Sequence, residues 1–280
     1  MSNLNIKDPL IQIELPININ KENFTIICCP ICNKTQKKHF SKIIINRVDI
    51  FIDYCSEDDV WWIGTRPGMD FYNNLYENIF YKSPIPEQFG YASLESGKTH
   101  RREKAILNWN DIEKGVCKPI AGSFLEIGCS TGEMLQEAVT RGWKKVTGID
   151  IDVDSCKIAL NKGLNVFHGS FESVDMLDEK FDLIFSDNVI EHLFDPIFAL
   201  KRCFLMQNKG ACLILRLPET FKTGPNLKLI DHTYHYTKKS ITLLLSAGGY
   251  KVDRLFFSGS YFSKDKTKRI DNMTVIAYRL

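Results

Sequence analysis

The chain has little excess charge of either sign. Its 280 residues include 36 Lys and Arg against 34 Asp and Glu, which gives a formal net charge of +2. A protein whose main partner is a phosphate backbone carries a much larger basic excess. The charge balance therefore argues against nucleic acid as a partner.

Long apolar runs are also missing. An uncharged apolar stretch of ~18 residues, the length needed to span a bilayer, occurs nowhere in the sequence. The opening stretch MSNLNIKDPL shows no apolar segment behind a basic start. We therefore expect a cytoplasmic protein with no membrane partner, whereas the oligomeric state is not indicated. With 44% hydrophobic residues, the chain can bury a sizeable core.

Two nucleotide-binding signatures are incomplete. The stretch LEIGCSTGEML begins at Leu125, and a dinucleotide fingerprint starting at Gly128 would need glycines where Ser130 and Glu133 stand. No Gly-Lys-Ser/Thr ending of a phosphate-binding loop follows this turn, because Gly132 is followed by Glu133 and Met134. Glu126, just before the turn, would repel phosphates and suits a cationic ligand. These features disfavour NAD as the cofactor.

From about residue 123 onward, short apolar runs alternate with segments of helical spacing. The runs are FLEI, KVTGI, LNVF, FDLIFS and ACLILRL, and the helical segments include EMLQEAVTRG and IFALKRCFLMQNKG. This alternation predicts an α/β fold, a parallel sheet with helices on both faces. The last runs, YKVDRLFF and TVIAYRL, are expected to pair as an antiparallel hairpin at the sheet edge.

The glycine-rich turn lies where such a sheet binds its ligand, beyond the carboxyl end of a strand. Gly128 and Gly132 leave little bulk over the backbone, and a helix starting near Glu133 would point its free amides at the ligand. Asp150 ends the next strand, where a carboxylate can accept hydrogen bonds from both ribose hydroxyls. Asp150 could instead cap the following helix.

Further motifs follow in a characteristic order: GIDID at 148–152, FHGSFES at 167–173, FDLIFSDNVIEHLFDP at 181–196 and NKGACLILRLP at 208–218. With these motifs, the chain from about 120 to 280 resembles the class I S-adenosylmethionine-dependent methyltransferases. Ser130 replaces the middle glycine of the family pattern. The resemblance implies a Rossmann-like sheet of seven strands and S-adenosylmethionine as the cofactor.

The resemblance also implies the cofactor contacts. Glu126 would order the turn or meet the ligand's ammonium group, Asp150 would hold the ribose, and Ser170 stands where many relatives carry the Asp that binds adenine. Since a hydroxyl is a weaker acceptor, adenine binding would depend more on the Phe171 backbone and on Ile151. The full predicted set is Glu126, Gly128, Cys129, Ser130, Gly132, Asp150, Ile151, Ser170, Phe171, Asp187 and Asn188.

The catalytic candidates follow the fourth strand of the core, in DNVIEHLFDP. Methyl transfer to a hydroxyl needs alignment and a base, and His192 has an ordinary pKa near neutrality. Glu191 could bind the substrate or join the base, and His232 or His235 could take either role from the segment LIDHTYHYTKK. The alternative is that these groups only hold their loops and that Thr237 caps the last helix.

The same strand end bears on the acceptor. Relatives that methylate nucleic-acid bases carry an Asn or Asp followed by two prolines and an aromatic residue here, and SDNV does not match. The form IEHLFDP looks like the branch that acts on small molecules such as sugars and quinone precursors. We therefore expect a small-molecule substrate.

Nine cysteines, an odd number, do not make a disulfide framework. Four of them are expected to act as small apolar residues: Cys117, Cys156, Cys203 and Cys212. Cys29 and Cys32 instead form a C-x-x-C pair suited to zinc, and Cys55 begins a second one that ends in Asp58. Cys28 or His39 could substitute for Asp58, and a metal-free hairpin is the alternative.

Three regions result. Residues 1–60 resemble, in a degenerate form, the small zinc-ribbon module that precedes the methyltransferase core in some sugar-modifying relatives. Residues 61–119 are expected to form an aromatic-rich helical connection or lid, and residues 120–280 the methyltransferase domain. In the connection, Tyr91, Arg101 and Arg102 are candidates to meet the cofactor carboxylate or an anionic substrate. The expected activity is methyl transfer to a small molecule, such as a sugar or nucleotide-linked sugar. A catalytically silent binding or regulatory protein is the first alternative, and a nucleotide-dependent oxidoreductase the second.

Overall fold

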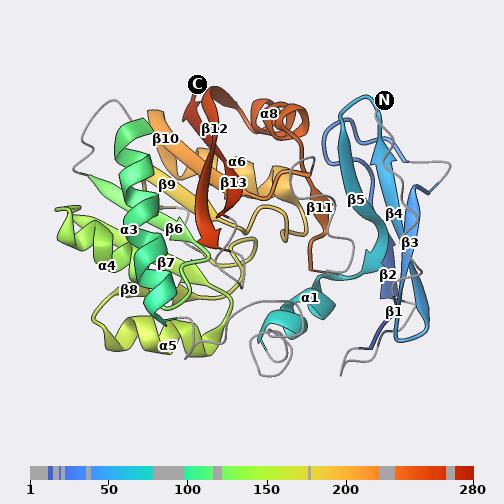
Figure 1. Ribbon diagram of the computed structural model, residues 1–280, viewed down its shortest axis with the longest axis horizontal. Helices are drawn as coiled ribbons and strands as arrows, with labels where there is room; N and C mark the ends of the chain where they lie inside the picture. The colour runs from blue at the N-terminus through green and yellow to red at the C-terminus, as the bar shows by residue number, and fades with distance from the viewer. Residues whose placement is uncertain are drawn as a thin grey trace.

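The computed structural model describes residues 12–14, 19, 23–35, 39–77, 98–115, 122–175, 178–220, 231–262 and 269–280. Two sheets organise these residues. In Figure 1 the N-terminal sheet lies on the right, and the larger sheet lies on the left with its helices. None of the helices in these ranges is both long and apolar enough to cross a membrane.

The larger sheet has seven strands in the order β12-β13-β10-β9-β6-β7-β8. Its parallel strands are β6 (Ser123–Ile127), β7 (Lys145–Asp150), β8 (Asn165–His168), β9 (Phe181–Asp187) and β10 (Gln207–Leu217). The antiparallel pair β12 (Tyr250–Phe262) and β13 (Arg269–Arg279) closes the edge beside β10. The predicted fold class is therefore confirmed. Because strand order reverses between β6 and β9, ligands are expected beyond the carboxyl ends of these two strands.

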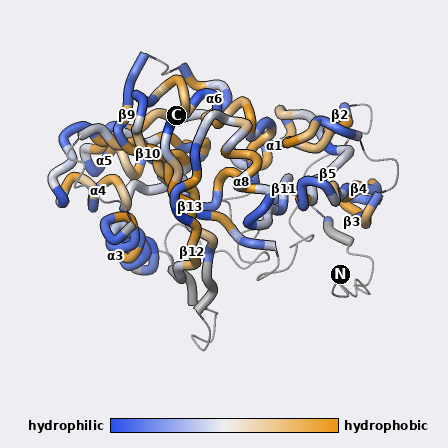
Figure 2. The backbone as a smooth tube through the Cα atoms, turned by 90° about the horizontal axis from the view of Figure 1, so that it is seen from above, coloured by the Kyte–Doolittle hydropathy of each residue, from blue (hydrophilic) through white to orange (hydrophobic). Residues whose placement is uncertain are grey.

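Helices cover both faces of this sheet. Helices α3 (Lys98–Gly115), α4 (Glu133–Thr140) and α5 (Val153–Asn161) pack on one face, and α6 (Pro196–Leu205) and α8 (Lys238–Ala247) pack on the other. Successive side chains of a strand point to opposite faces of the sheet, so the apolar core has two parts, one on each face. Phe124 packs with Trp109 of α3 on one face, whereas the next residue, Leu125, is buried on the other. Figure 2 shows α3 largely hydrophilic, with its outer side toward solvent.

The cysteines of the described ranges are all free thiols. Cys156, Cys203 and Cys212 are buried among apolar side chains, which confirms the prediction for them. Cys117 lies outside the described residues.

The N-terminal sheet contains β1 (Gln12–Ile13), β2 (Phe24–Ile26), β3 (Ser41–Ile45), β4 (Val48–Cys55) and β5 (Val60–Pro67). Its last strand is β11 (Tyr234–His235), which comes from the chain just before α8 and pairs antiparallel with β5. The Ile63 amide also donates to the Thr233 carbonyl at 3.0 Å. Trp62 is buried in the same core as Leu125, so the two sheets share one apolar interior.

Helix α1 (Met69–Leu75) follows β5. Phe71 and Leu75 lie one helical turn apart on it, and Leu75 is buried against the N-terminal sheet. The rest of the aromatic segment, including Tyr91, lies outside the described residues.

Candidate active site

The turn between β6 and α4 requires its two glycines. Gly128 has φ +77°, and a Cβ there would lie 2.4 Å from Cγ2 of Val189. Gly132, the N-cap of α4, has φ +84°, and a Cβ there would lie 2.4 Å from Cδ1 of Leu164. Both positions exclude side chains for conformational and steric reasons. Between them, Cys129 is buried and its thiol packs toward Gly148, so only its backbone is available to a ligand.

Asp150 binds this turn from the end of β7. Its Oδ2 accepts a hydrogen bond from the Ser130 amide at 2.7 Å, and its Oδ1 accepts one from the Asp152 amide at 2.8 Å. Each carboxylate oxygen can accept a further bond, so the pair remains suited to ribose hydroxyls. Burial raises the pKa of Asp150 to about 6, which these amides oppose. The cap of α5 is Asp152, which accepts from the Ser155 amide at 2.8 Å, so the capping alternative for Asp150 is wrong.

Glu126 lies beneath the turn on β6 and is buried. Burial raises its pKa well above the ordinary value, and the nearby charges of Asp187, Glu133 and Asp150 add to the shift. Its Oε2 has no hydrogen-bond partner among the described residues. A buried acceptor without a donor is costly, and a cationic or hydrogen-donating ligand would relieve this cost.

Asp187, at the end of β9, belongs to a buried polar network. Its Oδ2 lies 2.8 Å from Nζ of Lys104, 3.1 Å from Nδ2 of Asn108 and 3.3 Å from an Arg216 guanidinium nitrogen. Burial alone raises the pKa of Asp187, but the charges of Lys104 and Arg216 outweigh burial and lower it. Asn188, with φ +55°, follows and accepts a hydrogen bond from Asn272 at 2.8 Å. Asp187 and Asn188 are therefore fixed by bonds from α3, β10 and β13.

A second group of polar side chains lies just beyond β9. Nε2 of His192 is 3.7 Å from Oε1 of Glu191, and the ring centroids of His192 and His232 are 4.6 Å apart. The His235 ring lies 6.0 Å from that of His232. The structure thus brings together the predicted catalytic residues Glu191, His192 and His232, which come from two distant segments.

Burial sets the protonation of this group. It lowers the pKa of His192 and His235 to about 4 and that of His232 well below its ordinary value, so all three rings are neutral at pH 7. It raises the pKa of Glu191 to about 8, which its own backbone amide opposes only in part. The 3.7 Å contact between Glu191 and His192 is therefore not an ion pair between two charged groups.

Residues 125–215 match a family model described as a methyltransferase domain. A ubiquinone biosynthesis O-methyltransferase from Pseudomonas fluorescens is 30% identical over 112 residues, which cover 37% of this chain and 46% of that protein. The chain spans about half the length of the curated relatives it matches.

Two solved structures resemble the fold. An S-adenosylmethionine-dependent methyltransferase from Thermotoga maritima superposes with a TM-score of 0.53 at 18% identity, covering 72% of this chain and 98% of that one. Magnesium protoporphyrin IX methyltransferase from Synechocystis, solved with bound S-adenosylmethionine, gives a TM-score of 0.51 at 13% identity over 75% of this chain and 97% of that one. The core has the fold of the class I S-adenosylmethionine-dependent methyltransferases.

Within the methyltransferase domain, the segment after β8 differs from the rest of the predicted cofactor set. The Ser170 hydroxyl accepts from the Glu172 amide at 3.3 Å, and the Phe171 ring is buried in the core with the Arg202 guanidinium 5.5 Å from its centre. Ile151 offers its carbonyl to Nε2 of His168 at 3.1 Å. The side chains of Ser170 and Phe171 thus already have partners, which leaves backbone groups for adenine.

Lys104, Asn108 and Arg216 were not predicted from the sequence. Arg216 is fully buried in the methyltransferase sheet and donates to Thr274, to the Ser258 carbonyl, to Asn108 and to Asp187. The one available signal was an arginine inside the apolar run ACLILRL, since a buried cation needs acceptors. Arg101, a predicted anion contact, instead lies 3.8 Å from Glu133.

The N-terminal sheet holds the histidine-bearing segment against the domain. The Glu191 carbonyl accepts from Oγ1 of Thr233 at 3.0 Å and from the Tyr234 amide at 3.1 Å, on the segment that pairs with β5. Thr237 caps α8 in a capping box with Ser240, which confirms that part of the alternative given for this segment. Its hydroxyl also donates to the Asp59 carbonyl at 3.1 Å.

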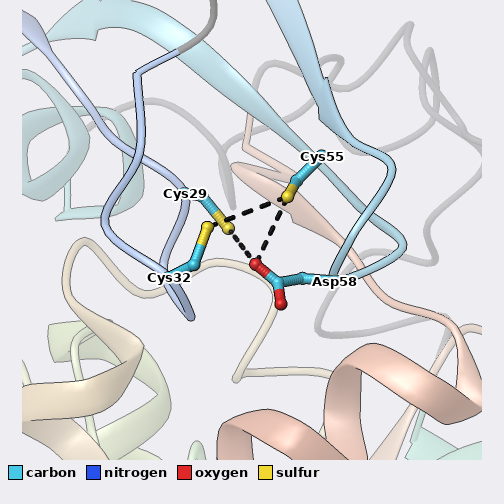
Figure 3. Close-up of side chains that lie close together, drawn as sticks. All are labelled: Cys29, Cys32, Cys55 and Asp58. Carbon is cyan, nitrogen blue, oxygen red and sulfur yellow. Dashed lines mark hydrogen bonds between the residues drawn. The ribbon is translucent and has the colours of Figure 1, made fainter.

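The predicted metal ligands Cys29, Cys32, Cys55 and Asp58, here called the cysteine cluster, lie close together (Figure 3). Oδ2 of Asp58 is 3.1 Å from Sγ of Cys29 and 3.3 Å from Sγ of Cys55, and Sγ of Cys32 is 3.8 Å from that of Cys55. All four ligand atoms lie within 4.8 Å of one another. The alternative ligand His39 is bound to Asp53 at 2.6 Å instead.

Proposed function

We propose that this chain transfers a methyl group from S-adenosylmethionine to a hydroxyl of a small molecule. The observation that carries the proposal is the joint placement of Glu126, the glycine turn and Asp150 where the strand order reverses. Glu126 and the turn would receive the methionine part, and Asp150 the ribose. The approach of a sulfonium also explains why an acidic residue underlies the turn.

The acceptor would lie beside Glu191, His192 and His232. The acceptor oxygen attacks the methyl carbon in line, the new O–CH3 bond forms as the S–CH3 bond breaks, and the sulfonium becomes a thioether. The acceptor proton must leave before or during this step, and Nε2 of His192, 3.7 Å from the Glu191 carboxyl group, can accept it. Burial lowers the pKa of His192 to about 4, so the ring is unprotonated at pH 7 but is a weaker base than an exposed histidine. We assign this chemistry to His192.

Hydroxylated small molecules fit this arrangement best. Sugars and nucleotide-linked sugars carry such hydroxyls, and the relatives named for ubiquinone biosynthesis O-methylation concern the same kind of bond. Neither the overall charge nor the strand end SDNV favours a nucleic acid.

We expect S-adenosylmethionine and its demethylated product to bind at one site per chain, with NAD giving no measurable heat. Isothermal titration calorimetry with the three ligands measures this difference. Binding of NAD alone would favour the oxidoreductase alternative. Binding of S-adenosylmethionine without turnover of any hydroxylated acceptor would favour a silent binding protein.

We further propose a structural zinc ion at Cys29, Cys32, Cys55 and Asp58. Two turns of the same form present these ligands. In the first turn, the Asn33 amide donates to the Cys29 carbonyl at 3.0 Å, and Asn33 has φ +58°. In the second turn, the Asp59 amide donates to the Cys55 carbonyl at 2.8 Å, and Asp59 has φ +59°. Asp58 therefore occupies the position in its turn that Cys32 occupies in the other, and a carboxylate is an accepted zinc ligand.

The purified protein should contain near one equivalent of zinc bound by thiolates. Cys29→Ser should release it and lower the melting temperature of the N-terminal sheet more than that of the core, because a structural metal contributes folding free energy. Elemental analysis and thermal unfolding measure both effects. Cys28→Ser is the matched control, since Cys28 neighbours the cluster without belonging to it. Reduced protein with an intact N-terminal sheet and no metal would contradict the proposal.

A further inference from the structure

The residues assigned to the acceptor side have the composition of a metal centre. Glu191, His192 and His232 each offer one ligand atom, and the three atoms lie within 4.8 Å of one another. Two imidazole nitrogens and one carboxylate oxygen suit divalent zinc, manganese, iron or cobalt, and three protein ligands leave coordination positions open for a substrate. We propose that these three residues bind one divalent metal ion and that the acceptor hydroxyl coordinates this ion.

The Glu191 carboxyl group gives the strongest support. Its residue is only 2% exposed, and neither Oε1 nor Oε2 has a hydrogen-bond partner among the described residues. Buried carboxyl oxygens without partners are rare because each forfeits its hydration without compensation. A cation between Glu191 and the two imidazoles would satisfy this group.

The contacts of His192 orient its ring for such an ion. Nδ1 lies 2.9 Å from the Asp231 carbonyl oxygen, which can only accept, and 2.9 Å from the Tyr76 hydroxyl, which can accept as well as donate. We therefore assign the hydrogen to Nδ1. The lone pair is then on Nε2, the atom that faces Oε1 of Glu191 at 3.7 Å. The Asp231 carboxylate lies behind the ring, 3.4 Å from Nδ1. Metal-bound histidines commonly donate their other nitrogen in this way, which fixes the tautomer and the ring orientation.

Hydrogen bonds fix the backbone of both segments that carry the proposed ligands. The His192 amide donates to the Val189 carbonyl at 2.9 Å, which closes the turn after β9. Thr233 and Tyr234, next to His232, both bond to the Glu191 carbonyl. The ligand set is therefore assembled across two segments before any ion arrives, which lowers the ordering cost of binding.

The ion would explain how a hydroxyl reacts in this buried place. Coordination lowers the pKa of a bound hydroxyl, so its proton is lost to water and the oxygen stays on the ion as the nucleophile. That oxygen then takes the methyl group as the S–CH3 bond breaks, and the charge of the ion is unchanged. His192 acts here as a ligand through Nε2, and this role replaces that of the base given to it above, because no second lone pair remains to accept a proton. The catalytic role of the ion rests on the proposed methyl transfer, whereas binding of the ion by Glu191, His192 and His232 does not.

The test counts metal ions in the full-length protein. After removal of metal by a chelator, titration with Co²⁺ should give two equivalents: one with the sulfur charge-transfer absorption of the cysteine cluster and one without it. Glu191→Gln and His232→Gln should each weaken the second site at least 10-fold while the sulfur absorption stays unchanged. Glu137→Gln, a surface carboxylate paired with Arg141 on α4, is the matched control and should retain both sites.

Calorimetry with S-adenosylmethionine checks that each variant keeps its fold. The proposal is overturned if the wild-type protein binds only the sulfur-ligated ion, or if folded Glu191→Gln and His232→Gln variants bind the second ion as tightly as the wild type. Loss of the second site with intact cofactor binding supports it. Failure of the methyltransferase function would appear separately, as a second ion bound without S-adenosylmethionine binding.

Discussion

His192→Gln should lower turnover by about 10²–10⁴-fold and leave the affinity for S-adenosylmethionine nearly unchanged. His192 follows β9 and lies next to Glu191 and His232, in the group of side chains proposed to face the acceptor. The same loss is expected whether the ring takes the proton itself or holds a cation, and the metal count distinguishes these two roles. Single-turnover kinetics and calorimetry on the purified variant give the rate and the affinity.

His39→Gln provides the control for this result. Its imidazole is partly exposed on the N-terminal sheet and bonds Asp53, so the same substitution there should leave turnover unchanged. An unfolded His192→Gln protein, or one that no longer binds the cofactor, would make His192 structural. Normal turnover would shift the assignment to His232, His235 or Glu191. The test needs a hydroxyl acceptor, because an acceptor that is already nucleophilic would react without this help.

Asp150→Ala should weaken binding of S-adenosylmethionine by about 1.5–3 kcal/mol, through loss of the charge-assisted bonds to the ribose. The pH dependence gives a second measurement. Burial raises the pKa of Asp150 to about 6, so the carboxylate is present above that pH and is lost as the pH falls through it. Wild-type affinity should therefore decrease below pH 6, and the variant should lack this dependence.

Asp154→Ala is the matched control for Asp150. It removes a carboxylate from the first turn of α5, where the side chain is exposed and pairs with Lys157. Its affinity for the cofactor should equal that of the wild type. Equal affinity in Asp150→Ala as well would remove Asp150 from the ribose site.

The sequence was most informative where a local segment has one structural solution. Gly128 and Gly132 fit a turn that side chains cannot enter, and the alternation of apolar runs with helical segments predicted the parallel sheet. The spacing from Cys55 to Asp58 likewise predicted a turn matching that of Cys29 and Cys32. Each of these predictions depends on a few neighbouring residues.

Contacts between distant segments could not be predicted in this way. Asn108 and Asp187 are 79 residues apart, and Arg216 and Asn108 are 108 residues apart, so no local pattern links them. The pairing of β11 with β5 was also unforeseen, because a two-residue strand leaves no periodicity to detect. The protonation states of Glu191 and His192 likewise follow from burial, which only the folded arrangement defines.

The pairing of β5 with β11 has a consequence for how the chain folds. Asp59 and Thr237, which bond beside this pairing, are 178 residues apart, so the contact closes a very long loop. During synthesis, the edge that carries Trp61 and Trp62 is made long before Tyr234 and His235 leave the ribosome. An unpaired strand edge next to two tryptophans is prone to association, so the nascent chain must keep this edge apart from other strands until most of the methyltransferase domain has been made.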